Sequence, residues 1–138
     1  YSATIETGVF IFFDMNEDSI YAFYGSLRRG MKLYETYKTA LDYQYSFWLS
    51  GYDLFALADY PCAVKSNSPT SNILIEVMKI KDRNVEKEIF KIEMFAGYFF
   101  TDIKIRNVSV GIFLFESGAN YQCVDHGDWV KFFGDRLK

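Results

Sequence analysis

Two segments far apart in the sequence carry residues that can act together on a small molecule. The first is the turn Tyr24-Gly25-Ser26-Leu27, which directly follows a strand-like segment. Gly25 lets the backbone approach a ligand closely, and successive N–H groups in such a turn can hold an anion such as a carboxylate. An ordinary connection between a strand and a helix has the same composition, so the turn alone leaves both interpretations open.

The second segment contains Glu93, near the C-terminal end of a predicted helix. Glu93 follows Phe90 by three residues, so the two side chains lie on the same side of that helix. The negative end of the helix dipole and the partly apolar neighbours both raise the pKa of a carboxyl group placed there. A general acid/base that works near neutral pH needs a pKa raised in this way. A solvated glutamate at a helix end is the alternative interpretation.

A third segment, His126-Gly127-Asp128-Trp129, is interpreted as structural. His126 is the one histidine in 138 residues, and no nucleophile accompanies it. We expect a turn in which Asp128 caps the next segment and Trp129 packs against the core. A single histidine also argues against a His-rich or Cys₂His₂ site, so no metal is predicted.

The composition limits the partners and the compartment. The net charge is −3 and no basic stripe is present, so we expect no nucleic-acid partner. Cys62 and Cys123 lack a Cys-x-x-Cys spacing, and we expect two reduced, mostly buried thiols in a cytoplasmic protein.

The N-terminal residues are expected to lie outside the main domain. The apolar run Gly8–Phe13 is too short to span a membrane and lacks the flanks of a signal peptide, so no membrane partner is predicted. Met15 stands shortly before the first recognisable motif. We therefore predict that residues 1–17 are an N-terminal extension or an extra strand, and that residues 18–138 form one domain.

The elements that must position the turn and the glutamate are mostly strands. Alternating side chains and turn residues predict strands over 19–24, in two pieces of 43–57 separated by Gly51, and over 73–80, 99–108 and 109–115. Helical spacing predicts helices over 33–41 and 84–95, the second capped by Asp82 or Asn84. The aromatic share of 20% suggests a core or pocket wall built from rings. The pattern favours an α+β domain, a small mixed, curled β-barrel with flanking helices.

Four segments in order resemble one protein family. The sequence is similar to the gamma-glutamyl cyclotransferase-like proteins, in particular the AIG2-like and gamma-glutamylamine cyclotransferase branch, from about Ser19 to Phe132. The resemblance rests on FYGSLRRG at 23–30, GYDLFALADYPCAV at 51–64, EVMKI at 76–80 with FKIEMFAGYF at 90–99, and HGDWVKF at 126–132.

The resemblance implies a reaction and the roles of several residues. Such an enzyme cyclises a gamma-glutamyl amine or amino-acid derivative to 5-oxoproline, releases the free amine and uses no cofactor. Tyr24, Gly25, Ser26 and Leu27 would bind the substrate, with backbone N–H groups on its anionic end. Glu93 would be the general acid/base, and Tyr98 would close one side of an aromatic-lined pocket.

Two positions depart from the family pattern, and alternatives to an enzyme therefore stay open. Met94 stands where glycine often follows the family glutamate, and Phe99-Phe100-Thr101 stands where an arginine is usual. The first alternative is a module on the same fold that binds a small ligand without turnover. The second is an aromatic-rich interaction domain that uses Gly8–Phe13 as a dimer contact. The expected partner is a small gamma-glutamyl substrate, and the expected state is a monomer or homodimer.

Overall fold

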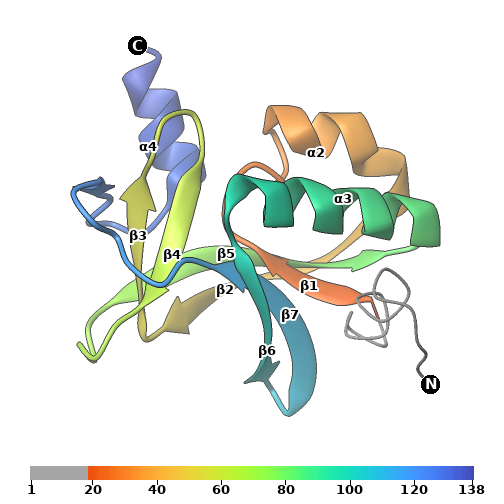
Figure 1. Cartoon of the computed structure of the whole chain (residues 1–138), viewed down its shortest axis with the longest axis horizontal. Helices are drawn as coiled ribbons and strands as arrows, with labels where there is room; N and C mark the ends of the chain where they lie inside the picture. Colours follow the sequence, from red (N-terminus) through yellow and green to blue (C-terminus); the bar gives the residue numbers. More distant parts are fainter. Residues whose placement is uncertain (1–18) are drawn as a thin grey trace.

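The computed structural model describes residues 19–138, which form two β-sheets with helices packed around them (Figure 1). The five-stranded sheet has the order β2-β5-β1-β7-β6 and consists of β1 (Ile20–Phe23), β2 (Leu41–Ser50), β5 (Asn72–Ile80), β6 (Phe99–Ile105) and β7 (Val108–Leu114). The three-stranded sheet has the order β4-β3-β8 and consists of β3 (Tyr52–Ala56), β4 (Pro61–Lys65) and β8 (Gln122–Cys123). The helices are α2 (Lys32–Tyr37), the short 3₁₀ helix η1 (Lys38–Ala40), α3 (Arg83–Ala96) and α4 (Trp129–Arg136).

Strand β1 lies in the middle of the larger sheet. It pairs antiparallel with β5 and parallel with β7. Its residues Tyr21, Ala22 and Phe23 are almost fully buried, as expected for a strand that is covered on both faces. The turn that begins at Tyr24 therefore leaves the sheet from an interior strand rather than from an edge.

Helix α3 begins and ends where its sequence dictates. The Asp82 side chain accepts hydrogen bonds from the backbone N–H groups of Asn84 and Val85, which confirms Asp82 as the N-cap. The helix ends at Gly97, whose φ of 106° is the left-handed conformation that glycine adopts without strain. Glu86 is buried on the inner face of α3. Glu93 follows it by about two helical turns and therefore lies on the same face of the helix.

The larger sheet curls strongly but does not close into a barrel. The Arg106 guanidinium, in the turn between β6 and β7, lies 4.5 Å from the centre of the Tyr45 ring on β2. The two sheets also meet where the Phe115 N–H donates to the Ala63 carbonyl at 3.0 Å. The α+β class is confirmed. The closed barrel is not found, because β2 and β6 end the strand order and no ladder within residues 19–138 joins them.

Helix α2 is shorter than predicted. The helix expected over 33–41 ends at Tyr37 and tightens into η1, because Leu41 already begins β2 by pairing with Ile80 of β5. In Figure 1 α2 and α3 lie on the same side of the sheet, whereas α4 stands apart from them beside the β3–β4 turn. A hydrogen bond from the Arg136 guanidinium to the Ala58 carbonyl holds α4 there.

Several smaller expectations have mixed outcomes. Cys62 and Cys123 are free thiols as predicted, but Cys123 is exposed because it lies on the two-residue strand β8 at the edge of the smaller sheet. The predicted extension or extra strand over residues 1–17 lies outside the described residues. Within residues 19–138, the helices are too short and too polar to cross a membrane.

Candidate active site

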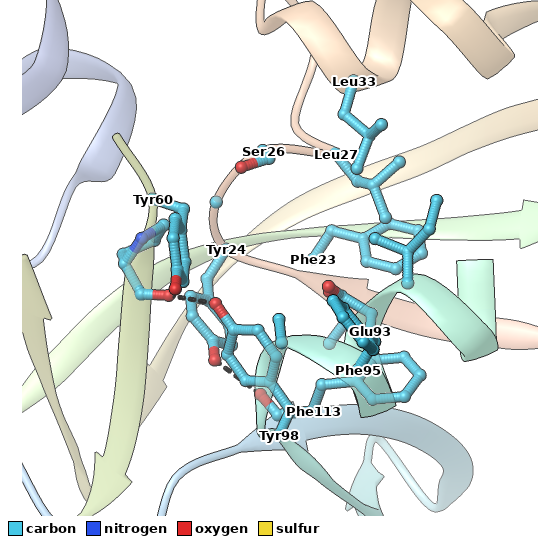
Figure 2. Close-up of a pocket in the computed structure, with 15 residues that line it drawn as sticks. Phe23, Tyr24, Ser26, Leu27, Leu33, Tyr60, Glu93, Phe95, Tyr98 and Phe113 are labelled. Carbon is cyan, nitrogen blue, oxygen red and sulfur yellow. Dashed lines mark hydrogen bonds between the residues drawn. The ribbon is translucent and has the colours of Figure 1, made fainter. Parts of the chain in front are cut away.

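A cavity of about 510 Å³ lies among the turn after β1, the C-terminal end of α3 and the turn between β3 and β4 (Figure 2). All six residues that the sequence predicts for the site line this cavity, namely Tyr24, Gly25, Ser26, Leu27, Glu93 and Tyr98. The rest of the lining is apolar or aromatic and comes from Ala22, Phe23, Leu33, Tyr60, Pro61, Ile92, Phe95, Ala96 and Phe113. The fold thus brings together two segments that are far apart in the sequence.

The turn after β1, Tyr24-Gly25-Ser26-Leu27, forms part of the cavity wall. The N–H groups of Gly25, Ser26 and Leu27 donate no hydrogen bond to any residue that the structure describes. Gly25 is packed so closely against the Pro61 ring that a Cβ atom there would lie 2.6 Å from the proline Cγ. Only glycine lets the turn approach Pro61 in this way, and the open N–H groups suit an anionic ligand.

A buried ionic network holds the turn from behind. The Glu76 carboxylate on β5 accepts hydrogen bonds from the Arg28 Nε at 3.2 Å and from the Arg29 backbone N–H at 2.9 Å. The Arg28 guanidinium also donates to Asp128 at 2.8 Å, the residue that caps α4. Partial burial raises the pKa of Asp128, but the hydrogen bonds from Arg28 and from the Lys131 N–H, together with the positive charge of Arg28, outweigh this effect, and the pKa is lowered. The network joins β5, α4 and the turn, and it was not predicted from the sequence.

Glu93 lies at the cavity wall with its carboxylate in largely apolar surroundings. Figure 2 shows the carboxylate directed from α3 toward the space enclosed by the turn and two tyrosines. Loss of solvent on burial raises the pKa of Glu93 from 4.5 to about 7. A carboxyl group with a pKa near neutrality exchanges protons readily in both directions at physiological pH. The cause of the shift is the loss of solvent among apolar neighbours, which agrees with the apolar surroundings predicted from the sequence.

Two tyrosines close the opposite side of the cavity. The Tyr24 hydroxyl donates to the Phe113 carbonyl at 2.5 Å and accepts from the Ala63 N–H at 3.1 Å. The Tyr98 hydroxyl donates to the Pro61 carbonyl. Burial raises the pKa of both phenols, so both are neutral. Their hydroxyls are occupied by the backbone, and the two residues contribute walls to the cavity rather than free polar groups.

The segment at His126 lies outside this cavity. His126 is exposed, and its Nδ1 accepts a hydrogen bond from the Asp128 N–H. Asp128 caps α4 and Trp129 is fully buried, which confirms the structural interpretation of the segment. Among residues 19–138, no group of three or more His, Cys, Asp or Glu side chains is arranged to hold a metal ion.

Sequence reasoning missed much of the cavity wall. Leu33 on α2 and Phe113 on β7 line the cavity but carry no local sign of a site in the sequence. Tyr60 also lines the cavity, and its Tyr-Pro turn was recognised only as part of the segment 51–64. In the structure, Gly25 packs against Pro61 of this turn.

The fold is similar to several solved structures. The protein PH0828 from Pyrococcus horikoshii has a TM-score of 0.70 at 23% identity, over 86% of this chain and 95% of that chain. The protein ytfP from Escherichia coli has a TM-score of 0.64 at 25% identity, over 86% of this chain and 99% of that chain. A region of allophanate hydrolase from Kluyveromyces lactis has a TM-score of 0.69 at 17% identity, over 91% of this chain and 22% of that much longer chain.

The sequence itself also identifies a family. No curated protein matches the chain significantly. Residues 21–131, which include the turn, Glu93 and the α4 cap, match the family described as gamma-glutamyl cyclotransferase, AIG2-like. This match covers most of the chain. The chain therefore belongs to the AIG2-like gamma-glutamyl cyclotransferase family.

Proposed function

We propose that the protein is an enzyme that cyclises a gamma-glutamyl amide to 5-oxoproline and releases the free amine. The family supports a cyclotransferase fold, and the cavity supports the chemistry. The observation that carries the proposal is the position of Glu93, which shares one cavity with the open N–H groups of Gly25, Ser26 and Leu27 and has a pKa of about 7.

The reaction needs positioning more than it needs a strong catalyst. The α-amine nitrogen of the substrate attacks its own γ-carbonyl carbon, so one C–N bond forms within a five-membered ring while the amide C–N bond breaks. Holding the two reacting groups together supplies much of the rate enhancement of such an intramolecular step. The N–H groups of the turn hold the α-carboxylate, and the tyrosine walls keep the substrate bent toward Glu93.

Glu93 moves the proton in this scheme. Ionised Glu93 accepts the proton that the attacking amine loses, and protonated Glu93 then donates it to the leaving nitrogen. Glu93 ends the reaction in its starting protonation state, because the proton that it accepts from the attacking amine is donated to the product amine. A pKa of about 7 suits both halves of this exchange, since neither protonation state is strongly favoured at neutral pH.

The test is release of 5-oxoproline from a panel of gamma-glutamyl amides by the parent protein and by Glu93→Gln. Glutamine keeps the shape of the side chain and removes its titration, so turnover is expected to fall roughly 10²- to 10⁴-fold. Glu88→Gln, on the exposed side of the same helix, is the matched control and is expected to retain full turnover.

Calorimetry with 5-oxoproline separates catalysis from binding. Binding is expected to survive in Glu93→Gln, because the donors that hold the carboxylate belong to the turn at Gly25–Leu27. Unchanged turnover in Glu93→Gln would exclude Glu93 as the acid/base. A parent protein that binds 5-oxoproline but turns over no member of the panel would be a ligand-binding module on the same fold.

A further inference from the structure

The proposed reaction needs a third polar group in the cavity, besides the turn after β1 and Glu93. When the α-amine nitrogen attacks the γ-carbonyl carbon, the electron pair of the C=O π bond moves onto the carbonyl oxygen. A hydrogen-bond donor at this oxygen lowers the barrier, because it interacts more strongly with the charged transition state than with the neutral carbonyl. In the proposed reaction the N–H groups of the turn hold the α-carboxylate and Glu93 carries the proton, so the donor is another group.

Few side chains of the cavity can donate a hydrogen bond. The polar side chains in its lining are Tyr24, Ser26, Tyr60, Glu93 and Tyr98. The hydroxyls of Tyr24 and Tyr98 already donate to backbone carbonyl groups. The hydroxyls of Ser26 and Tyr60 donate to no residue that the structure describes. Among the described side chains of the cavity, these two hydroxyls therefore have a hydrogen to offer to a substrate.

The shape of the product favours Tyr60 over Ser26. In 5-oxoproline the carboxylate and the ring carbonyl are bonded to the two carbons that flank the ring nitrogen, and the two groups point away from each other. Ser26 belongs to the turn that holds the carboxylate, so its hydroxyl lies at the opposite end of the ring from the carbonyl oxygen. Tyr60 comes from a different segment, the turn between β3 and β4, and also lines the cavity.

Tyr60 lies close to the other oxygen-bearing side chains of the site. In Figure 2, Tyr60 and Glu93 face the enclosed space from opposite sides. The pKa of Tyr98 is raised first by burial and then by the charges of its neighbours, which include Tyr24, Glu93 and Tyr60. The Tyr60 oxygen is therefore within electrostatic range of the groups that surround a bound substrate.

The Tyr60 backbone is fixed relative to the turn after β1. The Tyr60 carbonyl accepts a hydrogen bond from the Leu57 N–H at 3.0 Å. The next residue, Pro61, packs against Gly25, and its carbonyl accepts the Tyr98 hydroxyl. The Tyr60 ring also lies beside the Tyr98 ring, with 6.5 Å between the ring centres. A donor that is held in place before the reaction begins is the kind that stabilises a transition state.

We propose that the Tyr60 hydroxyl donates a hydrogen bond to the γ-carbonyl oxygen as this oxygen becomes negatively charged, and that Tyr60 is a catalytic residue. This inference rests on the proposed function and adds a residue to it. The hydroxyl keeps its proton throughout, because the electron pair on the oxygen re-forms the C=O bond when the amide C–N bond breaks. Glu93 remains the group that moves the proton from the attacking nitrogen to the leaving nitrogen.

Tyr60→Phe tests the donor, because phenylalanine keeps the ring and removes the hydroxyl. We expect kcat for release of 5-oxoproline to fall roughly 10²- to 10³-fold, with KM raised at most about tenfold. The free energy of unfolding by urea is expected to stay the same, since the Tyr60 hydroxyl makes no hydrogen bond within residues 19–138. Tyr121→Phe is the matched control and is expected to leave kcat unchanged, because Tyr121 is 41% exposed and lies outside the cavity.

Fluorinated tyrosines at position 60 give a readout that a purely structural role would not change. Fluorine lowers the pKa of the phenol and makes its O–H a stronger hydrogen-bond donor, with little change in size. We expect kcat to rise from tyrosine to monofluorotyrosine and difluorotyrosine, at a pH at which all three phenols are protonated. A kcat that is independent of the fluorine content, or unchanged in Tyr60→Phe, would overturn the inference and leave the cyclotransferase proposal standing.

Calorimetry separates this inference from the proposed function. The ligand 5-oxoproline presents a ring carbonyl to Tyr60, whereas cyclopentanecarboxylate keeps the ring and the carboxylate and has no ring carbonyl. Tyr60→Phe is expected to weaken 5-oxoproline binding about threefold to tenfold and to leave cyclopentanecarboxylate binding unchanged. If the parent turns over no gamma-glutamyl amide, the proposed function fails, and this pair of ligands still tests Tyr60. Equal losses for the two ligands, or no loss for either, would overturn the assignment of Tyr60 to the carbonyl oxygen.

Discussion

Replacing Glu93 with glutamine is expected to stabilise the protein at neutral and alkaline pH. Burial raises the pKa of Glu93 from 4.5 to about 7, so the native protein binds this proton more tightly than the unfolded chain does. The stability that the protonated carboxyl group contributes is therefore complete below about pH 4.5 and is lost as the pH rises to about 7. At about 1.36 kcal/mol per pKa unit, the shift from 4.5 to about 7 corresponds to a loss of about 3.4 kcal/mol. Partial solvent exposure of the side chain lowers this loss to about 2–3 kcal/mol.

The measurement is the free energy of unfolding by urea for both proteins between about pH 4 and pH 8.5. Glutamine is neutral throughout, so the advantage of Glu93→Gln is expected to be near zero at the acid end and to level off above about pH 7. Glu116→Gln, at an exposed loop position, is the control and is expected to show no such pH-dependent gain. A difference between parent and Glu93→Gln that is constant across the pH range would refute burial of a titrating carboxylate at this position.

Three other substitutions test the structure around the turn. Glu76→Gln leaves Arg28 without its buried carboxylate and is expected to cost about 3 kcal/mol in urea unfolding; a cost below about 1 kcal/mol would contradict the network. Gly25→Ala places a Cβ atom against Pro61 and is expected to lower the free energy of unfolding by about 1–3 kcal/mol. It is also expected to weaken 5-oxoproline binding in calorimetry, and unchanged affinity would show that the turn is not part of the binding site. Tyr98→Phe deprives the buried Pro61 carbonyl of its donor and is expected to lower stability by about 1–3 kcal/mol, measured by urea unfolding; a neutral result would mean that the hydrogen bond contributes nothing.

Structural features that depend on residues close together in the chain could be predicted from the sequence. The N-cap at Asp82 and the apolar spacing of α3 depend on contacts within a few turns, so both the helix and the position of Glu93 at its end were recognisable. The turn after β1 was recognisable for the same reason, because Gly25 follows a strand directly. The family resemblance then connected the two segments, and the cavity between them agrees with that connection.

Features that depend on strand register could not be predicted. Arg28 and Glu76 are 48 residues apart, and their contact exists because β1 and β5 are paired in one particular register. The break between β6 and β7 was predicted after Val108, but the turn lies earlier, at Arg106 and Asn107. These two residues adopt φ angles of 52° and 67° without the glycine that usually marks such a hairpin turn. The open sheet edge at β2 could not be predicted either. Whether a curled sheet closes into a barrel depends on the pairing of its first and last strands, and local sequence does not specify that pairing.

The most direct test of the proposed site is a crystal structure of Glu93→Gln with an uncleaved gamma-glutamyl amide. We predict that the α-carboxylate accepts hydrogen bonds of about 2.7–3.2 Å from the N–H groups of Gly25, Ser26 and Leu27. We also predict that the amide nitrogen lies within hydrogen-bond distance of the side chain at position 93. A ligand whose carboxylate binds elsewhere, or whose scissile amide lies outside the reach of that side chain, would contradict the proposed site.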